Sequence, residues 1–170
     1  MLSDLTVSGV SASEELRRLP YKSATVFFPQ REFPLHAMLS SGGHSLETET
    51  DYSWDGTARG KTSFAVLQLT LGGAGRLDIR GGSVELLPKT FMLVHIPGPH
   101  RYWLPPEAPS WEFVYLVVYG RELLRLILGI ERRQGNVITL SDSSRIPTAF
   151  LSVLQPLLSS NSFTPFEISS

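Results

Sequence analysis

The sequence contains no cysteine, which excludes a disulfide framework and a thiolate metal site. Neither sign of charge is in excess, because 15 Lys and Arg residues stand against 16 Asp and Glu residues. A nucleic-acid-binding domain normally carries a basic surface, so this balance argues against direct DNA binding. No apolar run reaches membrane-spanning length. The 170 residues, 42% of them hydrophobic, suffice for one domain with a substantial core.

Several functional motifs are also missing. Residues 1–9 lack a basic segment followed by an apolar core, so no signal peptide is expected. The expected location is therefore the cytoplasm. The glycine-rich turn at Gly72–Gly75 is not followed by Lys-Ser/Thr, as a phosphate loop would be. No GxSxG nucleophile elbow occurs. The sequence therefore predicts neither a P-loop nucleotide site nor an α/β-hydrolase site.

Residues 91–119 are the most informative stretch. Its apolar segments predict three strands, separated by two Pro-rich turns, at 91–96, 100–104 and 111–119. Side chains alternate between the two faces of a strand. His100 and Tyr102 are therefore expected on one face, as are Phe113 and Tyr115, together with Trp111. The turn at 105–109 is expected to join the last two strands as a hairpin, so that these faces become neighbours.

Shorter strands surround this stretch. The pattern predicts strands at 64–71, 76–80 and 83–87, separated by glycine turns, with a further turn at Ser41–Gly43 and a loop at Asp51–Lys61. Many short strands with turns between them are typical of a small β-barrel or sandwich. The expected fold class is therefore mainly β.

Helices are expected on both sides of these strands. A short one is predicted within 11–19, capped by Ser13, and an apolar one spans 121–130. Another begins near Arg145, and Pro156 should kink or end it. Its apolar side chains form one wide stripe that includes Phe150, Leu154, Leu157 and Leu158. The stripe is either a core face or a dimer face.

Two histidines are candidate metal ligands. His44 and His100 are the suitably placed candidates, but a catalytic metal normally needs three protein ligands. His44 and Glu47 also fall on opposite faces of a strand. We therefore expect no metal and no cofactor.

Four segments of the chain resemble the N-terminal domain of AraC-type transcription regulators: YSWDGTARG, LQLTLGGAGRLDI, LLPKTFMLVHIPGPHRYWLP and WEFVYLVVYGRE. The resemblance covers Tyr52 to Leu158. It implies a cupin-like (jelly-roll) β-barrel that holds a small effector, followed by C-terminal α-helices that dimerise. It also implies a separate DNA-binding domain, absent from this chain.

The resemblance also implies site residues. Tyr102, Arg59, Tyr115 and Phe113 fall where a sugar-responsive family member contacts its ligand. Phe113 replaces a hydrogen-bonding His, so arabinose is not the expected ligand. Trp54 is expected at the mouth of the pocket and His100 near its polar end. Together, these residues predict a site for a small polar effector, such as a sugar or small acid.

The expected organisation has four parts: an N-terminal arm at 1–22, an effector-binding barrel at 23–120, a helical dimerisation segment at 121–160 and the start of an interdomain linker at 161–170. The stripe residues Phe150, Leu154, Leu157 and Leu158 would form a homodimer interface. The leading hypothesis is a non-enzymatic small-molecule-sensing and dimerisation domain of a regulator. The alternatives are a metal-dependent cupin enzyme and a free-standing carbohydrate-binding module.

Overall fold

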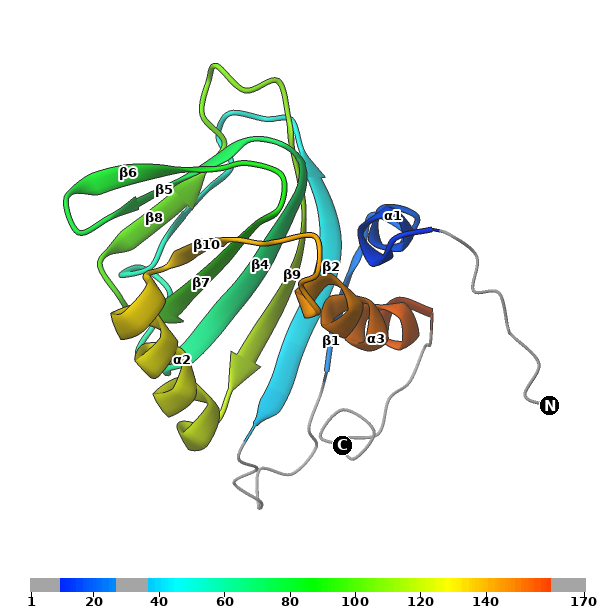
Figure 1. Cartoon of the computed structure of the whole chain (residues 1–170). Coiled ribbons are helices and arrows are strands. Elements are labelled where there is room, and N and C mark those ends of the chain that lie inside the picture. The colour runs from blue at the N-terminus through cyan, green and yellow to red at the C-terminus, as the bar shows by residue number, and fades with distance from the viewer. Residues whose placement is uncertain (1–9, 27–36, 160–170) are drawn as a thin grey trace.

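Two antiparallel β-sheets face each other in a computed structural model of the chain (Figure 1), which describes residues 10–26 and 37–159. The larger sheet has the order β1 (Ser23–Thr25), β2 (Met38–Glu47), β9 (Trp111–Tyr119), β4 (Phe64–Gly73), β7 (Thr90–Ile96) and β10 (Val137–Thr139). The smaller has the order β3 (Ser53–Asp55), β8 (His100–Trp103), β5 (Gly75–Ile79) and β6 (Gly82–Leu86).

From β2 to β9 the chain crosses repeatedly between the two sheets, as in a jelly roll. Three helices accompany the sheets: α1 (Ala12–Arg17), α2 (Arg121–Gln134) and α3 (Ile146–Ser159). The predicted fold class, a mainly β cupin-like barrel followed by C-terminal helices, is confirmed. No helix among the described residues is long and apolar enough to cross a membrane.

The larger sheet is buried on both faces, which explains its nearly continuous apolar strands. On β7, Met92 and Val94 point into the space between the sheets, whereas Phe91 and Leu93 point toward the helices. The strand β9 divides in the same way, with Phe113 inside and Val114 on the helix side. The molecule therefore has two apolar cores, the barrel interior and the layer beneath the helices.

The helices follow the predicted pattern with shifted boundaries. Helix α1 is capped by Ser11 rather than Ser13, because Ser11 forms a reciprocal capping box with Glu14. Helix α2 continues past Gly129 to Gln134. Helix α3 continues through Pro156 to Ser159, so this proline does not end it.

The stripe on α3 lies in the core of the single chain. Its residues are each at most 3% exposed: Phe150, Leu154, Leu157 and Leu158. They pack against the outer face of the larger sheet, where Gly42 leaves room for the methyl groups of Leu154 and Leu157. Of the two alternatives open in the sequence, the structure favours a core face over a dimer face, because intrachain packing already buries these side chains.

Three local expectations are wrong. Ser41–Gly43 is not a turn but the middle of β2, paired with both β1 and β9. The segment Asp51–Lys61 is not entirely loop, since it contains β3. The turn at 105–109 does not form a hairpin, because β8 pairs with β3 and β5 in one sheet while β9 belongs to the other.

The predicted domain boundaries fall close to element boundaries, without being tested by them. Strands β1 to β9 lie between Ser23 and Tyr119, and α2 begins at Arg121. The larger sheet also includes β10 at Val137–Thr139, inside the predicted helical segment. The expected linker at 161–170 and most of the first half of the arm, residues 1–9, lie outside the described residues.

Candidate functional site

Three of the predicted site residues point into the barrel interior from facing sheets. Tyr102 on β8 is 4% exposed, Phe113 on β9 is 1% exposed and Tyr115 is half-buried. The alternation along each strand places them there, as expected. They approach each other across the barrel rather than along a hairpin. The sequence thus identified the correct faces with the wrong connection.

Arg59 reaches this group from the loop between β3 and β4. Its Nη1 donates a hydrogen bond to the Tyr102 hydroxyl at 2.8 Å. The guanidinium carbon lies 4.6 Å from the ring centroid of Trp54 and 5.0 Å from that of Phe64. Such stacking holds a guanidinium in place while leaving most of its N–H groups available. Arg59, Trp54 and Tyr102, predicted separately, therefore come together.

An aromatic wall continues from this group. The ring centroids of Phe113 and Tyr115 are 6.2 Å apart, and Trp111 lies 4.6 Å from Phe113. Tyr52 completes the wall at 5.9 Å from Phe113 and 6.0 Å from Trp111. Tyr52 was not predicted as a site residue, since it precedes β3 in a segment without clear periodicity.

The tyrosine hydroxyls of the site are protonated at neutral pH. Burial raises the pKa of Tyr102 to about 12, although the Arg59 guanidinium acts in the opposite direction. Burial also raises the pKa of Tyr52 and of Tyr115. Each hydroxyl can then donate as well as accept a hydrogen bond. Tyr102, which accepts from Arg59, retains its own proton for a ligand.

Two further polar side chains on this side of the larger sheet were missed. Glu47 on β2 is half-buried, and burial raises the pKa of its carboxyl while a hydrogen bond from Ser45 lowers it. Gln68 on β4 is 1% exposed, and its Nε2 has no hydrogen-bond partner. Gln68 lies opposite Tyr115 in the strand register. A polar residue inside the apolar run FAVLQLTL is the signal that would have found it.

His100 lies on β8 in the smaller sheet, whereas His44 lies on β2 in the larger one. His100 is 6% exposed, its ring stacks at 6.3 Å on Tyr102, and its Nε2 has no partner. Burial lowers its pKa, which favours the neutral imidazole. Gly56 lies against the ring so closely that no side chain would fit there. His100 therefore borders the site, behind Tyr102.

An open cavity of about 620 Å³ lies on the other side of His100. Its lining is formed by Asp55, Thr57, Asp78, Ile79, Arg80, Gly81, Gly82, Ser83, Pro99, His100 and Arg101. His100 is the one predicted site residue in this lining. The carboxylates of the cavity already accept hydrogen bonds within the chain. Asp55 accepts hydrogen bonds from Thr57, and Asp78 accepts them from Ser83 and Trp103. Arg59, Tyr102, Phe113 and Tyr115 do not line this cavity.

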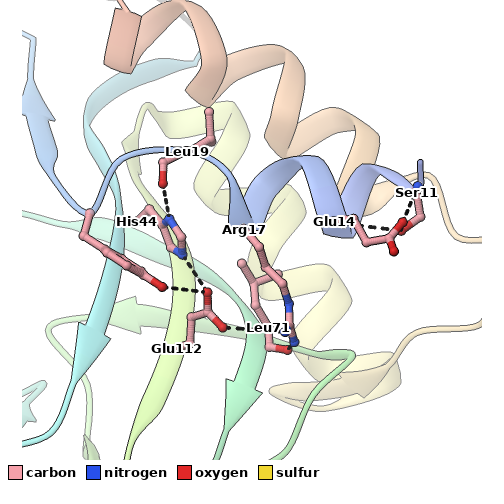
Figure 2. Close-up of polar contacts among 8 residues, drawn as sticks. Ser11, Glu14, Arg17, Leu19, His44, Leu71 and Glu112 are labelled. Atoms are coloured by element: carbon pink, nitrogen blue, oxygen red, sulfur yellow. Dashed lines mark hydrogen bonds and ion pairs between the residues drawn. The ribbon is translucent and has the colours of Figure 1, made fainter. Parts of the chain in front are cut away.

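His44 belongs to a structural cluster on the helix side of the larger sheet (Figure 2). Its Nδ1 lies 2.9 Å from the carbonyl oxygen of Leu19, and its Nε2 lies 3.2 Å from Glu112 Oε1. Tyr21 also donates to Glu112, at 3.2 Å, and Arg17 donates to the Leu71 carbonyl. Both ring nitrogens of His44 thus make contacts within the chain, one with Leu19 in the N-terminal arm and one with Glu112 on β9. No group of three metal-ligating side chains occurs within residues 10–26 and 37–159.

Comparison with known proteins identifies the family. A family model described as the AraC-like ligand binding domain matches residues 43–170. No curated protein matches the sequence.

Solved structures similar to the chain include two cupin domains. A Cupin_2 domain of an XRE family transcriptional regulator from Enterobacter cloacae is 18% identical, with a TM-score of 0.32 over 55% of this chain and 92% of its own. A Cupin 2 conserved barrel domain protein from Salinispora arenicola is 10% identical, with a TM-score of 0.38 over 75% and 98%. The plu4264 protein from Photorhabdus luminescens is 11% identical, with a TM-score of 0.36 over 69% and 92%. Because the family model covers most of the chain, this protein belongs to the family of AraC-like ligand-binding domains.

Proposed function

We propose that this chain is the small-molecule-sensing and dimerisation domain of an AraC-type transcription regulator. The observation that carries the proposal is the Arg59–Tyr102 pair, which borders the aromatic interior of the barrel with hydrogen-bonding groups unused. Among the described residues, no carboxylate lies within ion-pair distance of Arg59. An arginine without an acidic partner, fixed between aromatic rings, is suited to bind an oxygen-rich ligand.

The site favours a small polar effector. Phe113 and Tyr115 present flat faces, which can pack on the apolar side of a sugar ring or another flat molecule. Tyr102, Tyr52 and Arg59 add directional hydrogen bonds around that surface. A sugar or a small acid fits this combination. His100 and Trp54 limit the site at its two borders.

Binding of DNA is assigned to a different domain. The formal net charge of the chain is −1, which provides little net attraction for the phosphate backbone. A regulator of this type would contact DNA through its second domain and would act in the cytoplasm. The effector would alter that contact from the barrel.

Dimerisation is proposed through the helical segment at 121–160. The stripe on α3 is buried, so the contact needs another surface. Leu126 on α2 is 58% exposed and is the most exposed of the large apolar side chains in the described part of the chain. A second copy covering Leu126 would remove it from water. Sedimentation of the wild type and of Leu126→Glu tests this arrangement: a dimer that persists in the variant contradicts it.

The enzyme alternative is less well supported. A cupin enzyme with a catalytic metal needs about three side-chain ligands around one point. His44 and His100 belong to different sheets, and His44 uses both ring nitrogens in structural contacts. We therefore propose a binding domain without catalytic activity.

A thermal-shift screen tests the proposed function. Sugars, polyols, small carboxylic acids and amino acids are added to the wild type, and any compound that raises the unfolding temperature is measured again with two variants. Arg59→Ala should abolish the shift. Arg101→Ala is the matched control, because Arg101 lies on the outward face of β8 and is exposed. Loss of binding in both variants, or in neither, contradicts the proposed site.

A further inference from the structure

We propose that the effector is a small zwitterion, whose anionic group binds Arg59 and whose ammonium group binds Glu47. This inference rests on the proposed function of the same site and specifies the class of ligand. It follows from two unpaired charges of opposite sign that border one aromatic surface. The residues that connect them are Tyr102, Tyr52, Phe113, Tyr115 and Trp111.

The cationic end is Arg59. One of its N–H groups is used by Tyr102, and its faces pack on Trp54 and Phe64. The side chain is half-buried, which limits its hydration without removing it from solvent. A guanidinium has five N–H donors in a planar arrangement that matches a carboxylate. The ligand therefore places its anionic group here.

The anionic end is Glu47. It lies opposite Trp111 in the strand register and, like Ser45, on the interior side of β2. No basic side chain among the described residues forms an ion pair with it. Burial raises the pKa of its carboxyl, so the ionised form lacks full compensation in the free protein. A ligand ammonium would provide that compensation.

The two ends are parts of one site. Tyr52 packs against Trp111, the register neighbour of Glu47, and also against Phe113. Tyr115 packs against Phe113 from the next interior position of β9. Its hydroxyl is under the influence of both charges, since Glu47 raises its pKa and Arg59 lowers it. The aromatic surface thus extends from one charge to the other.

Gln68 adds an unused polar group on the same interior face of the larger sheet. Gln68 lies on β4, opposite Tyr115 of β9. It is 1% exposed, and its Nε2 has no hydrogen-bond partner. A buried amide nitrogen without a partner is unfavourable, so a ligand acceptor that reaches it would be favoured. Arg59 would thus bind an anionic group of the ligand, Glu47 a cationic group and Gln68 a neutral hydrogen-bond acceptor.

Other ligand classes satisfy fewer of these groups. A neutral sugar would leave both charges without a counterion. A simple carboxylic acid would pair with Arg59 and bring its negative charge toward Glu47. A simple amine would pair with Glu47 only. A zwitterion is the class that compensates both.

The test uses amino acids of increasing length as probes: glycine, 3-aminopropanoate, 4-aminobutanoate, 5-aminopentanoate, 6-aminohexanoate and the α-amino acid L-leucine. Butanoate and butylamine are the singly charged controls, and L-arabinose is the neutral one. Calorimetry should show at least one zwitterion binding about tenfold or more tightly than both singly charged controls, since a charge-assisted contact is lost in each.

Two variants assign the ammonium contact. Glu47→Gln should weaken the best zwitterion about tenfold and leave or improve butanoate binding. Glu49→Gln, an exposed carboxylate two residues away, should change neither. Unchanged circular dichroism and unfolding temperature would show that both variants fold.

The failures of the two proposals are distinguishable. Tighter binding of L-arabinose than of every zwitterion, or equal binding of the zwitterion to wild type and Glu47→Gln, overturns the zwitterion. So does the absence of binding for every probe in the set. The proposed function fails separately, if the wider thermal-shift screen also yields no compound whose binding depends on Arg59.

Discussion

Replacement of Leu154 by Ala is expected to destabilise the single chain strongly. Leu154 lies on α3 with 0% exposure, within the apolar layer between the helices and the larger sheet. Its Cδ2 lies 3.0 Å from where a β-carbon on Gly42 would be, which shows how closely helix and strand approach. The truncation would leave a cavity that the neighbouring backbone cannot readily fill.

The magnitude follows from measured truncations of buried leucines. Such changes cost about 2–5 kcal/mol, and full burial places Leu154 toward the upper part of that range. With a urea dependence of about 2 kcal/mol per molar, the midpoint of unfolding should fall by about 1–2.5 M. Urea denaturation followed by circular dichroism measures this directly.

Leu87→Ala is the matched control, because the same truncation is made at 46% exposure and away from the proposed dimer contact. Its effect on the free energy of unfolding should stay within about 0.5 kcal/mol. The comparison also decides between core and interface. If Leu154→Ala kept the wild-type midpoint and instead halved the mass in solution, the stripe on α3 would be a dimer face and the packing described above would be refuted.

Three further predictions concern the strand packing, a buried carboxyl and metal. Gly42→Ala should lower the free energy of unfolding by about 1–3 kcal/mol in urea denaturation, because the new methyl would lie 2.9 Å from Leu116 Cδ2. Gly82→Ala is the control and should be close to neutral, because the nearest atom to its methyl would be 3.8 Å away. Equal effects of the two variants would contradict this packing. Burial raises the pKa of Glu131 above its unfolded value, so the folded state loses stability as pH rises through the folded pKa. Glu131→Gln should therefore raise the unfolding temperature more at pH 7 than at pH 4. A larger rise at pH 4 would refute this reasoning. Metal analysis should find no stoichiometric transition metal, and one equivalent of iron, manganese or zinc lost in His100→Ala would support the enzyme alternative.

Strand alternation was predictable because it depends on local backbone geometry. The shared face of Phe113 and Tyr115, and that of His100 and Tyr102, needed only the period of two. The partner of each strand was not predictable in this way. A Pro-rich segment such as 105–109 has the same composition in a hairpin and in a crossing between sheets, so the predicted β8–β9 hairpin was wrong.

Glycine had two different meanings in this sequence. In the β5–β6 turn, Arg80 and Gly81 have φ of 53° and 76°, so these two residues form the turn and Gly82 already belongs to β6. Gly42 and Gly43 instead lie inside β2, where close neighbours exclude a side chain. Sequence alone does not distinguish a glycine required by φ from one required by packing.

The candidate site was predicted in part. The structure places Arg59 in contact with both Tyr102 and Trp54, although the sequence predicted each of these residues separately. Glu47 and Gln68 were missed, because their importance depends on which groups lack partners after folding. That property belongs to the tertiary structure and leaves only a weak trace in the sequence, a polar residue within an apolar strand.

The central claim is that the barrel interior binds a small effector through Tyr102. Calorimetric titration of the compound that most raises the unfolding temperature, into wild type and Tyr102→Ala, tests it most directly. The account predicts one binding site per chain in the wild type and at least a tenfold weaker affinity in the variant, since the hydroxyl and its hydrogen bond with Arg59 are removed. Equal affinity in a variant that remains folded would contradict the claim.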